Sequence, residues 1–68
     1  MITGNQLRLL RISSRQTQAE LATKLGNGGY TEQMVAAIEN DKRNINISIL
    51  GDWGNACGYN VNISFDKI

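Results

Sequence analysis

The chain has 68 residues and a formal net charge of +1, which leaves room for one domain with a modest core. It has no histidine and one cysteine, Cys57, which excludes a disulfide framework, the usual zinc sites and the nucleophile-histidine pairs of hydrolases. No run approaches the roughly 18 apolar residues of a membrane span, and we expect a cytoplasmic protein that is not an enzyme and that uses no metal, cofactor or membrane.

A first helix is predicted over residues 4–13. Thr3 and Gln6 have the spacing of a capping box, in which each side chain accepts a hydrogen bond from the other residue's backbone N–H. The side chains expected to face the core are Leu7, Leu10 and Ile12.

Two further short helices are predicted between residues 17 and 39, joined by a glycine-rich turn. Thr17 and Glu20 form a second capping box, and Gly26 lies where a left-handed residue would end that helix. Thr31 can cap the next helix, and Asn40 with Asp41 ends it, because these residue types tolerate left-handed backbone.

A fourth helix is predicted to follow a loop. Residues 44–49 alternate in polarity, which taken alone resembles a short strand, but Asn46 or Ser48 can cap a helix. An apolar stripe at helical spacing follows, and Gly58 ends it. The stripe consists of Leu50, Trp53, Ala56 and Cys57.

Residues 59–66 alternate apolar and polar side chains and predict a strand. A lone strand has unpaired edges, so we expect it to pair with its copy in a second subunit across a twofold axis. The apolar side chains expected at this dimer contact are Tyr59, Val61, Ile63 and Phe65. The predicted fold is therefore all-α, with four helices in residues 1–58 and a C-terminal β-strand and tail in residues 59–68.

Residues 4–59 resemble the helix-turn-helix family of small phage repressors and Cro proteins, also called the Xre family. The most specific match is T-Q-A-E-L-A at residues 17–22, followed by Leu25-Gly26 and later by Ile38-Glu39-Asn40. The resemblance implies an ion pair between Arg11 and Glu39, and a phosphate contact from Gln18 at the start of the second helix.

The resemblance also implies a function. We expect a sequence-specific regulator of transcription that binds double-stranded DNA, of the phage or mobile-element repressor type, acting as a homodimer on a palindromic operator. The alternative is an antitoxin that neutralises a protein toxin and regulates its own operon, because some antitoxins resemble this helical domain followed by a strand.

Three features depart from the family pattern. Residues 27–29, Asn-Gly-Gly, look like an insertion into the usual tight turn, and Asp41 stands where glycine is usual. The predicted strand replaces the final helix of many members, which favours a sheet contact between subunits over a helical one.

The third helix is the predicted DNA-reading element. Its expected base contacts come from Glu32, Gln33, Met34 and Ala37, which lie off the inward stripe of Val35 and Ile38. Its expected phosphate contacts come from Arg15, Gln18, Thr31, Lys42 and Arg43. The small net charge predicts few phosphate contacts and modest affinity for random DNA.

Overall fold

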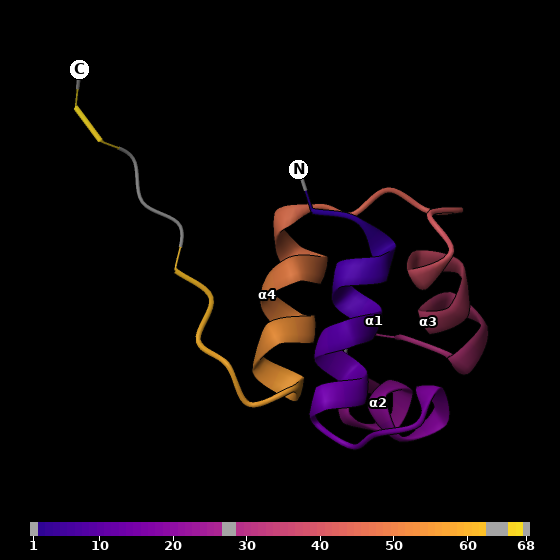
Figure 1. Ribbon diagram of the computed structural model, residues 1–68. Helices are drawn as coiled ribbons and strands as arrows, with labels where there is room; N and C mark the ends of the chain where they lie inside the picture. Colours follow the sequence, from indigo (N-terminus) through magenta and orange to yellow (C-terminus); the bar gives the residue numbers. More distant parts are fainter. Residues whose placement is uncertain (1, 27–28, 63–65, 68) are drawn as a thin grey trace.

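The computed structural model describes residues 2–26, 29–62 and 66–67. In that part of the chain four helices form, as predicted, and α1 lies between α4 and α3 with α2 across one end (Figure 1). The helices are α1 (Gly4–Ser13), α2 (Gln18–Lys24), α3 (Glu32–Glu39) and α4 (Ile47–Ala56).

The start of each helix is set by a polar side chain. Thr3 and Thr17 form complete capping boxes with Gln6 and Glu20, as the spacing predicts. Thr31 Oγ1 accepts from the Met34 backbone N–H at 3.1 Å to start α3. Of the two capping residues considered for α4, Asn46 is the one used, because its Oδ1 accepts from the Ile49 N–H at 2.8 Å.

Three of the helices end in the same way. The residue after the C-cap has a positive φ, and the next N–H donates back to a carbonyl five residues earlier, which is a Schellman motif. The left-handed residues are Arg15, Asp41 and Gly58, with φ of 60°, 58° and 89°. For α2 the prediction was wrong: Gly26 lacks a positive φ, and in the described part of the connection that follows, Gly29 has one, at 79°.

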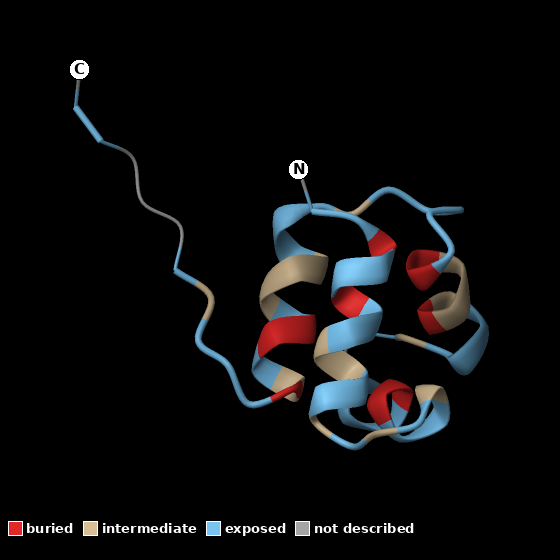
Figure 2. Cartoon of the chain, viewed as in Figure 1, coloured by how far each residue is buried: buried red, intermediate tan, exposed pale blue. Residues whose placement is uncertain are grey.

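The core lies where α1, α3 and α4 face one another and is closed by α2 (Figure 2). Its fully buried side chains are Leu7, Leu21, Val35, Ile38 and Trp53. The Trp53 ring also satisfies its only donor, because Nε1 donates to the Leu7 carbonyl oxygen at 2.9 Å and so fixes α4 against α1.

The inward position predicted for Ile12 is wrong, because this side chain is 53% exposed. Successive residues of an α-helix are about 100° apart, so Ile12 lies roughly 200° from Leu10 and about 140° from Leu7. The face that carries Leu7 cannot also carry Ile12.

At Gly4 the backbones of α1 and α3 approach each other closely. A Cβ built on Gly4 would lie 2.5 Å from the Glu39 carbonyl oxygen and 2.7 Å from its carbon, so any side chain would collide with backbone. At the same place Asp41 Oδ1 accepts from the Gly4 N–H at 2.8 Å. The residue that ends α3 therefore also caps α1.

The segment after α4, residues 59–62, is irregular and not a strand, and it leaves the end of α4 and turns back beside it (Figure 1). Its first N–H, that of Tyr59, donates to the Gly54 carbonyl oxygen at 2.9 Å, and the Val61 side chain occupies the space that a Cβ on Gly54 would need. The predicted strand is thus not found in residues 59–62 or 66–67, and Tyr59 and Val61 instead contact Gly54 of α4. Ile63 and Phe65 lie outside the described residues.

Candidate nucleic-acid interface

The predicted base-contacting residues lie together on one side of α3. Glu32 and Gln33 are exposed on the first turn, while Met34 and Ala37 are half-buried beside them. We call these four residues the reading face. The opposite side of α3 is anchored in the core by Val35 and Ile38, so the reading face projects from a helix whose rotation about its axis is fixed.

The C-terminal end of α3 is held by a bidentate ion pair. Arg11 Nε donates to Glu39 Oε2 at 2.6 Å and Nη2 donates to Oε1 at 3.0 Å, while the Glu39 side chain is 2% exposed. The hydrogen bond to Glu39 raises the pKa of Arg11, with burial acting in the opposite direction. The pair thus joins α1 to α3.

Two glutamines complete this network. The third Arg11 nitrogen, Nη1, donates to the Gln16 carbonyl oxygen at 2.9 Å, which fixes the α1–α2 connection. Gln18 Nε2 donates to Glu39 Oε1 at 3.0 Å. Gln18, which is expected to contact phosphate, is therefore oriented by the ion pair, through one of the two N–H groups of its amide.

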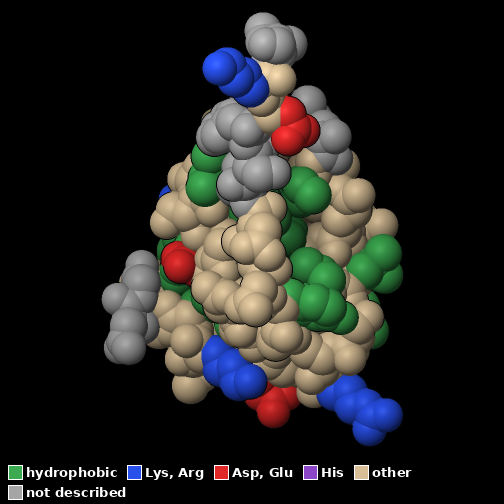
Figure 3. Space-filling view, turned by 90° about the vertical axis from the view of Figure 1, so that its left-hand side faces the viewer, with side chains coloured by type: hydrophobic (Ala, Val, Ile, Leu, Met, Phe, Trp, Pro, Cys, Tyr) green, Lys and Arg blue, Asp and Glu red, His purple; other side chains and the backbone are tan. Residues whose placement is uncertain are grey.

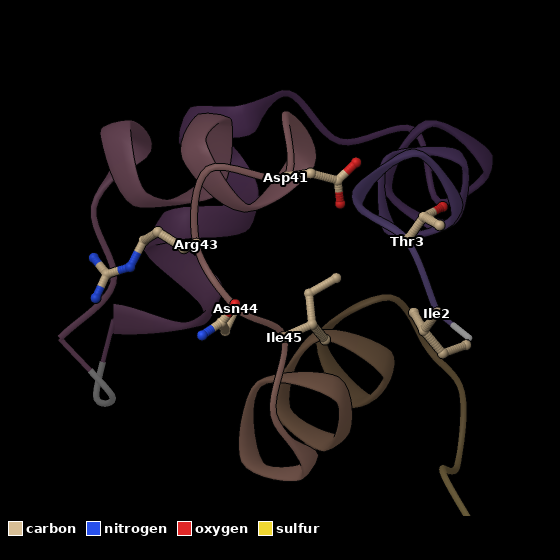
Figure 4. Close-up of a pocket in the computed structure, with 6 residues that line it drawn as sticks. All are labelled: Ile2, Thr3, Asp41, Arg43, Asn44 and Ile45. Atoms are coloured by element: carbon tan, nitrogen blue, oxygen red, sulfur yellow. The ribbon is translucent and has the colours of Figure 1, made fainter.

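The remaining predicted phosphate contacts surround the reading face in the sequence. Thr31 is the exposed N-cap of α3, and Lys42 and Arg43 are exposed just beyond the C-terminal end of the same helix. Arg15 is exposed just after the end of α1. In Figure 4 the Arg43 side chain extends away from Ile2 and Thr3, on the far side of a hollow of about 530 Å³ that all three help to line. The guanidinium group thus points outward.

Three contacts of this region were missed by the sequence reasoning. Asp41 caps α1, Gln16 Nε2 donates to the Ala56 carbonyl oxygen at 3.1 Å, and Tyr30 donates to Asp52 Oδ2 at 3.1 Å. Each joins residues 22 to 40 positions apart, so no local spacing predicts them. The one available signal was Gly4, a glycine at a helix start that propensity alone does not favour.

The face formed by α4 and residues 59–62 carries Tyr59 and Val61, two of the four predicted dimer contacts. Tyr59 is 51% exposed and Val61 is half-buried on Gly54. Figure 3 shows hydrophobic side chains on both sides of the C-terminal segment, with charged groups mainly at the margins. Pairing of Tyr59 and Val61 with a second subunit stays a prediction.

The residues that the structure describes contain neither a membrane-spanning helix nor a cluster of metal ligands. Within them, no helix is long and apolar enough to cross a membrane. The same residues contain no group of three or more potential metal ligands.

Comparison with known proteins agrees with this geometry. A family model described as helix-turn-helix matches residues 7–63, which is most of the chain. No curated protein and no solved structure gave a match. The chain belongs to the Xre/Cro-like helix-turn-helix family of DNA-binding regulators of transcription.

Proposed function

We propose that this protein is a sequence-specific repressor of transcription that reads double-stranded DNA with α3. The observation that carries the proposal is the division of α3 into two faces. One face is fixed in the core by Val35 and Ile38 and at its end by Glu39, and the other presents the reading face. An exposed but rigidly held helix of this kind fits the major groove.

The chemistry of the reading face suits direct contact with base edges. The Gln33 amide can bond in bidentate fashion to an adenine, and the Glu32 carboxylate can accept from a cytosine amino group. Met34 and Ala37 supply apolar surface for a thymine methyl group. One bidentate contact is worth about 1–3 kcal/mol of discrimination between bases.

Phosphate contacts would set the position of the reading face on the duplex. The second N–H of the Gln18 amide and the Thr31 hydroxyl can donate to phosphate oxygens beside the groove. Arg15, Lys42 and Arg43 would add positive charge there. Since the net charge is only +1, we expect affinity for random DNA to be low and its dependence on salt to be shallow.

The operator is proposed to be palindromic and bound by a homodimer. The exposed Tyr59 and the apolar surface beside it support a contact between subunits at this end of the chain. Two reading helices would then enter successive major grooves about 34–36 Å apart. Repression by blocking access of polymerase, in the cytoplasm of a host of phage or mobile elements, is the simplest mechanism for a regulator that occupies its operator in this way.

The test is selection of binding sites from a randomised duplex library at near-physiological salt. We expect a palindromic motif with half-sites one helical turn apart, and we expect Gln33→Ala to weaken binding to that motif about tenfold or more with little effect on random DNA. Asn55→Ala, which removes an exposed amide from α4, is the matched control.

Two results would contradict the proposal. Equal losses on selected and random DNA would remove Gln33 from the reading face. Recovery of no motif by the wild-type protein would overturn DNA reading itself and turn the search to a protein partner such as a toxin.

A further inference from the structure

In the described part of the connection between α2 and α3, the Tyr30 side chain is attached to α4. Tyr30 directly precedes the α3 N-cap, and its hydroxyl donates to Asp52 Oδ2 at 3.1 Å, across 22 residues of sequence. The ring is half-buried and packs against the hydrophobic core. Tyr30 is thus held twice: its ring packs against the hydrophobic core, and its hydroxyl is hydrogen-bonded to Asp52 of α4.

The two ends of α3 are held in different ways. Its C-terminal end is fixed by the Arg11–Glu39 ion pair and by Asp41 on Gly4. The connection before its N-terminal end contains Gly26 and Gly29, which have no side chain to pack, and Gly29 has a φ of 79°. Glycine leaves the backbone many accessible conformations, so the entry of α3 depends on Tyr30, which is anchored directly before the α3 N-cap.

We propose that the Tyr30–Asp52 hydrogen bond is a positioning contact that fixes the N-terminal half of α3, and with it Glu32 and Gln33, for reading DNA. This inference rests on the proposed function. Neither Tyr30 nor Asp52 needs to touch DNA for this role. The bond reduces the number of orientations that the first turn of α3 samples, so a larger fraction of the free protein is ready to bind.

The groups involved are suited to a lasting contact at neutral pH. Partial burial, and then the hydrogen bond to Asp52, raise the pKa of Tyr30 above its ordinary value of 10.0. The phenol therefore remains a donor. A hydrogen bond from a neutral donor to a carboxylate is stronger than one between two neutral groups, although solvent access weakens this one.

Tyr30→Phe tests the proposal, because it keeps the ring in the core and removes only the hydroxyl. Ser13→Ala, which removes an exposed hydroxyl at the end of α1, is the matched control. In the absence of DNA, we expect faster hydrogen exchange at the amides of Met34 and Val35, which bond to Thr31 at the start of α3. Exchange at the Asn40 amide, at the other end of α3, should stay unchanged.

With the selected duplex, Tyr30→Phe should lose affinity about threefold to tenfold while its affinity for random DNA stays the same. Asp52→Ala should cause the same loss, and the double variant should lose no more than either single variant. A merely structural role would instead lower the thermal stability and weaken binding to both kinds of DNA.

Unchanged exchange at Met34 and Val35, or unchanged affinity for the selected duplex, would overturn the inference. So would additive losses in the double variant. A wild-type protein that selects no duplex would instead overturn the proposed function, and the exchange data would still decide whether the bond holds α3.

Discussion

Replacing Gly4 by alanine should separate steric fit from helix propensity. Alanine is the best helix former, so propensity alone predicts a gain in stability from Gly4→Ala. The new methyl group would, however, lie 2.5 Å from the Glu39 carbonyl oxygen, and still closer to that of Ile38. Both neighbours are backbone atoms at the end of α3, which cannot rotate away as a side chain can.

The expected cost follows from the shift that this contact requires. Real Cβ atoms essentially never come within 3.0 Å of such atoms, so α1 must move away from α3 by at least half an ångström or so. That movement stretches the 2.8 Å bond from Gly4 to Asp41 and disturbs the packing of Leu7. Overpacking of this kind costs about 2–3 kcal/mol, which in a domain of this size lowers Tm by about 10–20 °C.

The assay is thermal and urea unfolding followed by circular dichroism. Gly51→Ala is the matched control, because Gly51 lies inside α4 and a Cβ there has nothing within 4 Å. This control should gain about 1 kcal/mol. If Gly4→Ala were as stable as the wild type or more so, the close approach of α1 to α3 would be refuted.

Three further predictions concern charged residues. Glu39→Ala should destabilise the fold by about 3 kcal/mol in urea unfolding, because it leaves the largely buried Arg11 unpaired. Glu32→Ala, at an exposed position, should change stability by less than about 0.5 kcal/mol. Similar losses in the two variants would contradict this. The backbone and hydroxyl of Thr17 lower the pKa of Glu20 below 4.5, so its contribution is present above pH 4.5 and is lost as the pH falls through the lower folded-state pKa. Glu20→Gln should therefore show a weaker fall in Tm on acidification than the wild type, and identical acid profiles would disprove the assignment. Arg15→Gly should raise the free energy of unfolding by about 0.5–1 kcal/mol, because glycine accepts the φ of 60° there without strain. It should also weaken binding to selected and random duplexes alike, and lower the slope of log affinity against log salt concentration by about one. Unaltered binding would exclude a phosphate contact.

The helix starts could be predicted because their signals are local. A capping box needs two residues three positions apart, and Thr3 and Thr17 both lie in one. The period of 3.6 residues selected Leu7, Val35 and Trp53 for the core. The same rule should have excluded Ile12, whose position fits the face of neither Leu7 nor Leu10.

The prediction of a strand after Gly58 shows where local pattern fails. Alternation indicates that a segment can pair in a sheet, but a ladder needs a partner, which a local pattern does not supply. At Tyr59 and Val61 the segment instead packs on α4, because Gly54 lacks the Cβ that would exclude Val61.

For the candidate site, sequence could select the helix and its outward residues but not the contacts that orient them. The pairing of Arg11 with Glu39 came from family resemblance, and the bond from Gln18 to the same carboxylate depends on how α2 crosses α3. The bond between Tyr30 and Asp52 likewise requires α4 to lie beside the turn. Such contacts are properties of the tertiary structure.

The bond from Gly4 to Asp41 also bears on how the domain folds. The first N–H of α1 finds its acceptor 37 residues later, at the residue that reverses the chain after α3. An isolated peptide of residues 2–16 would lack this acceptor, and a helix of ten residues is marginal by itself. The start of α1 and the end of α3 should therefore unfold and refold as one cooperative unit, with no partly folded form in which α1 persists after α3 has melted.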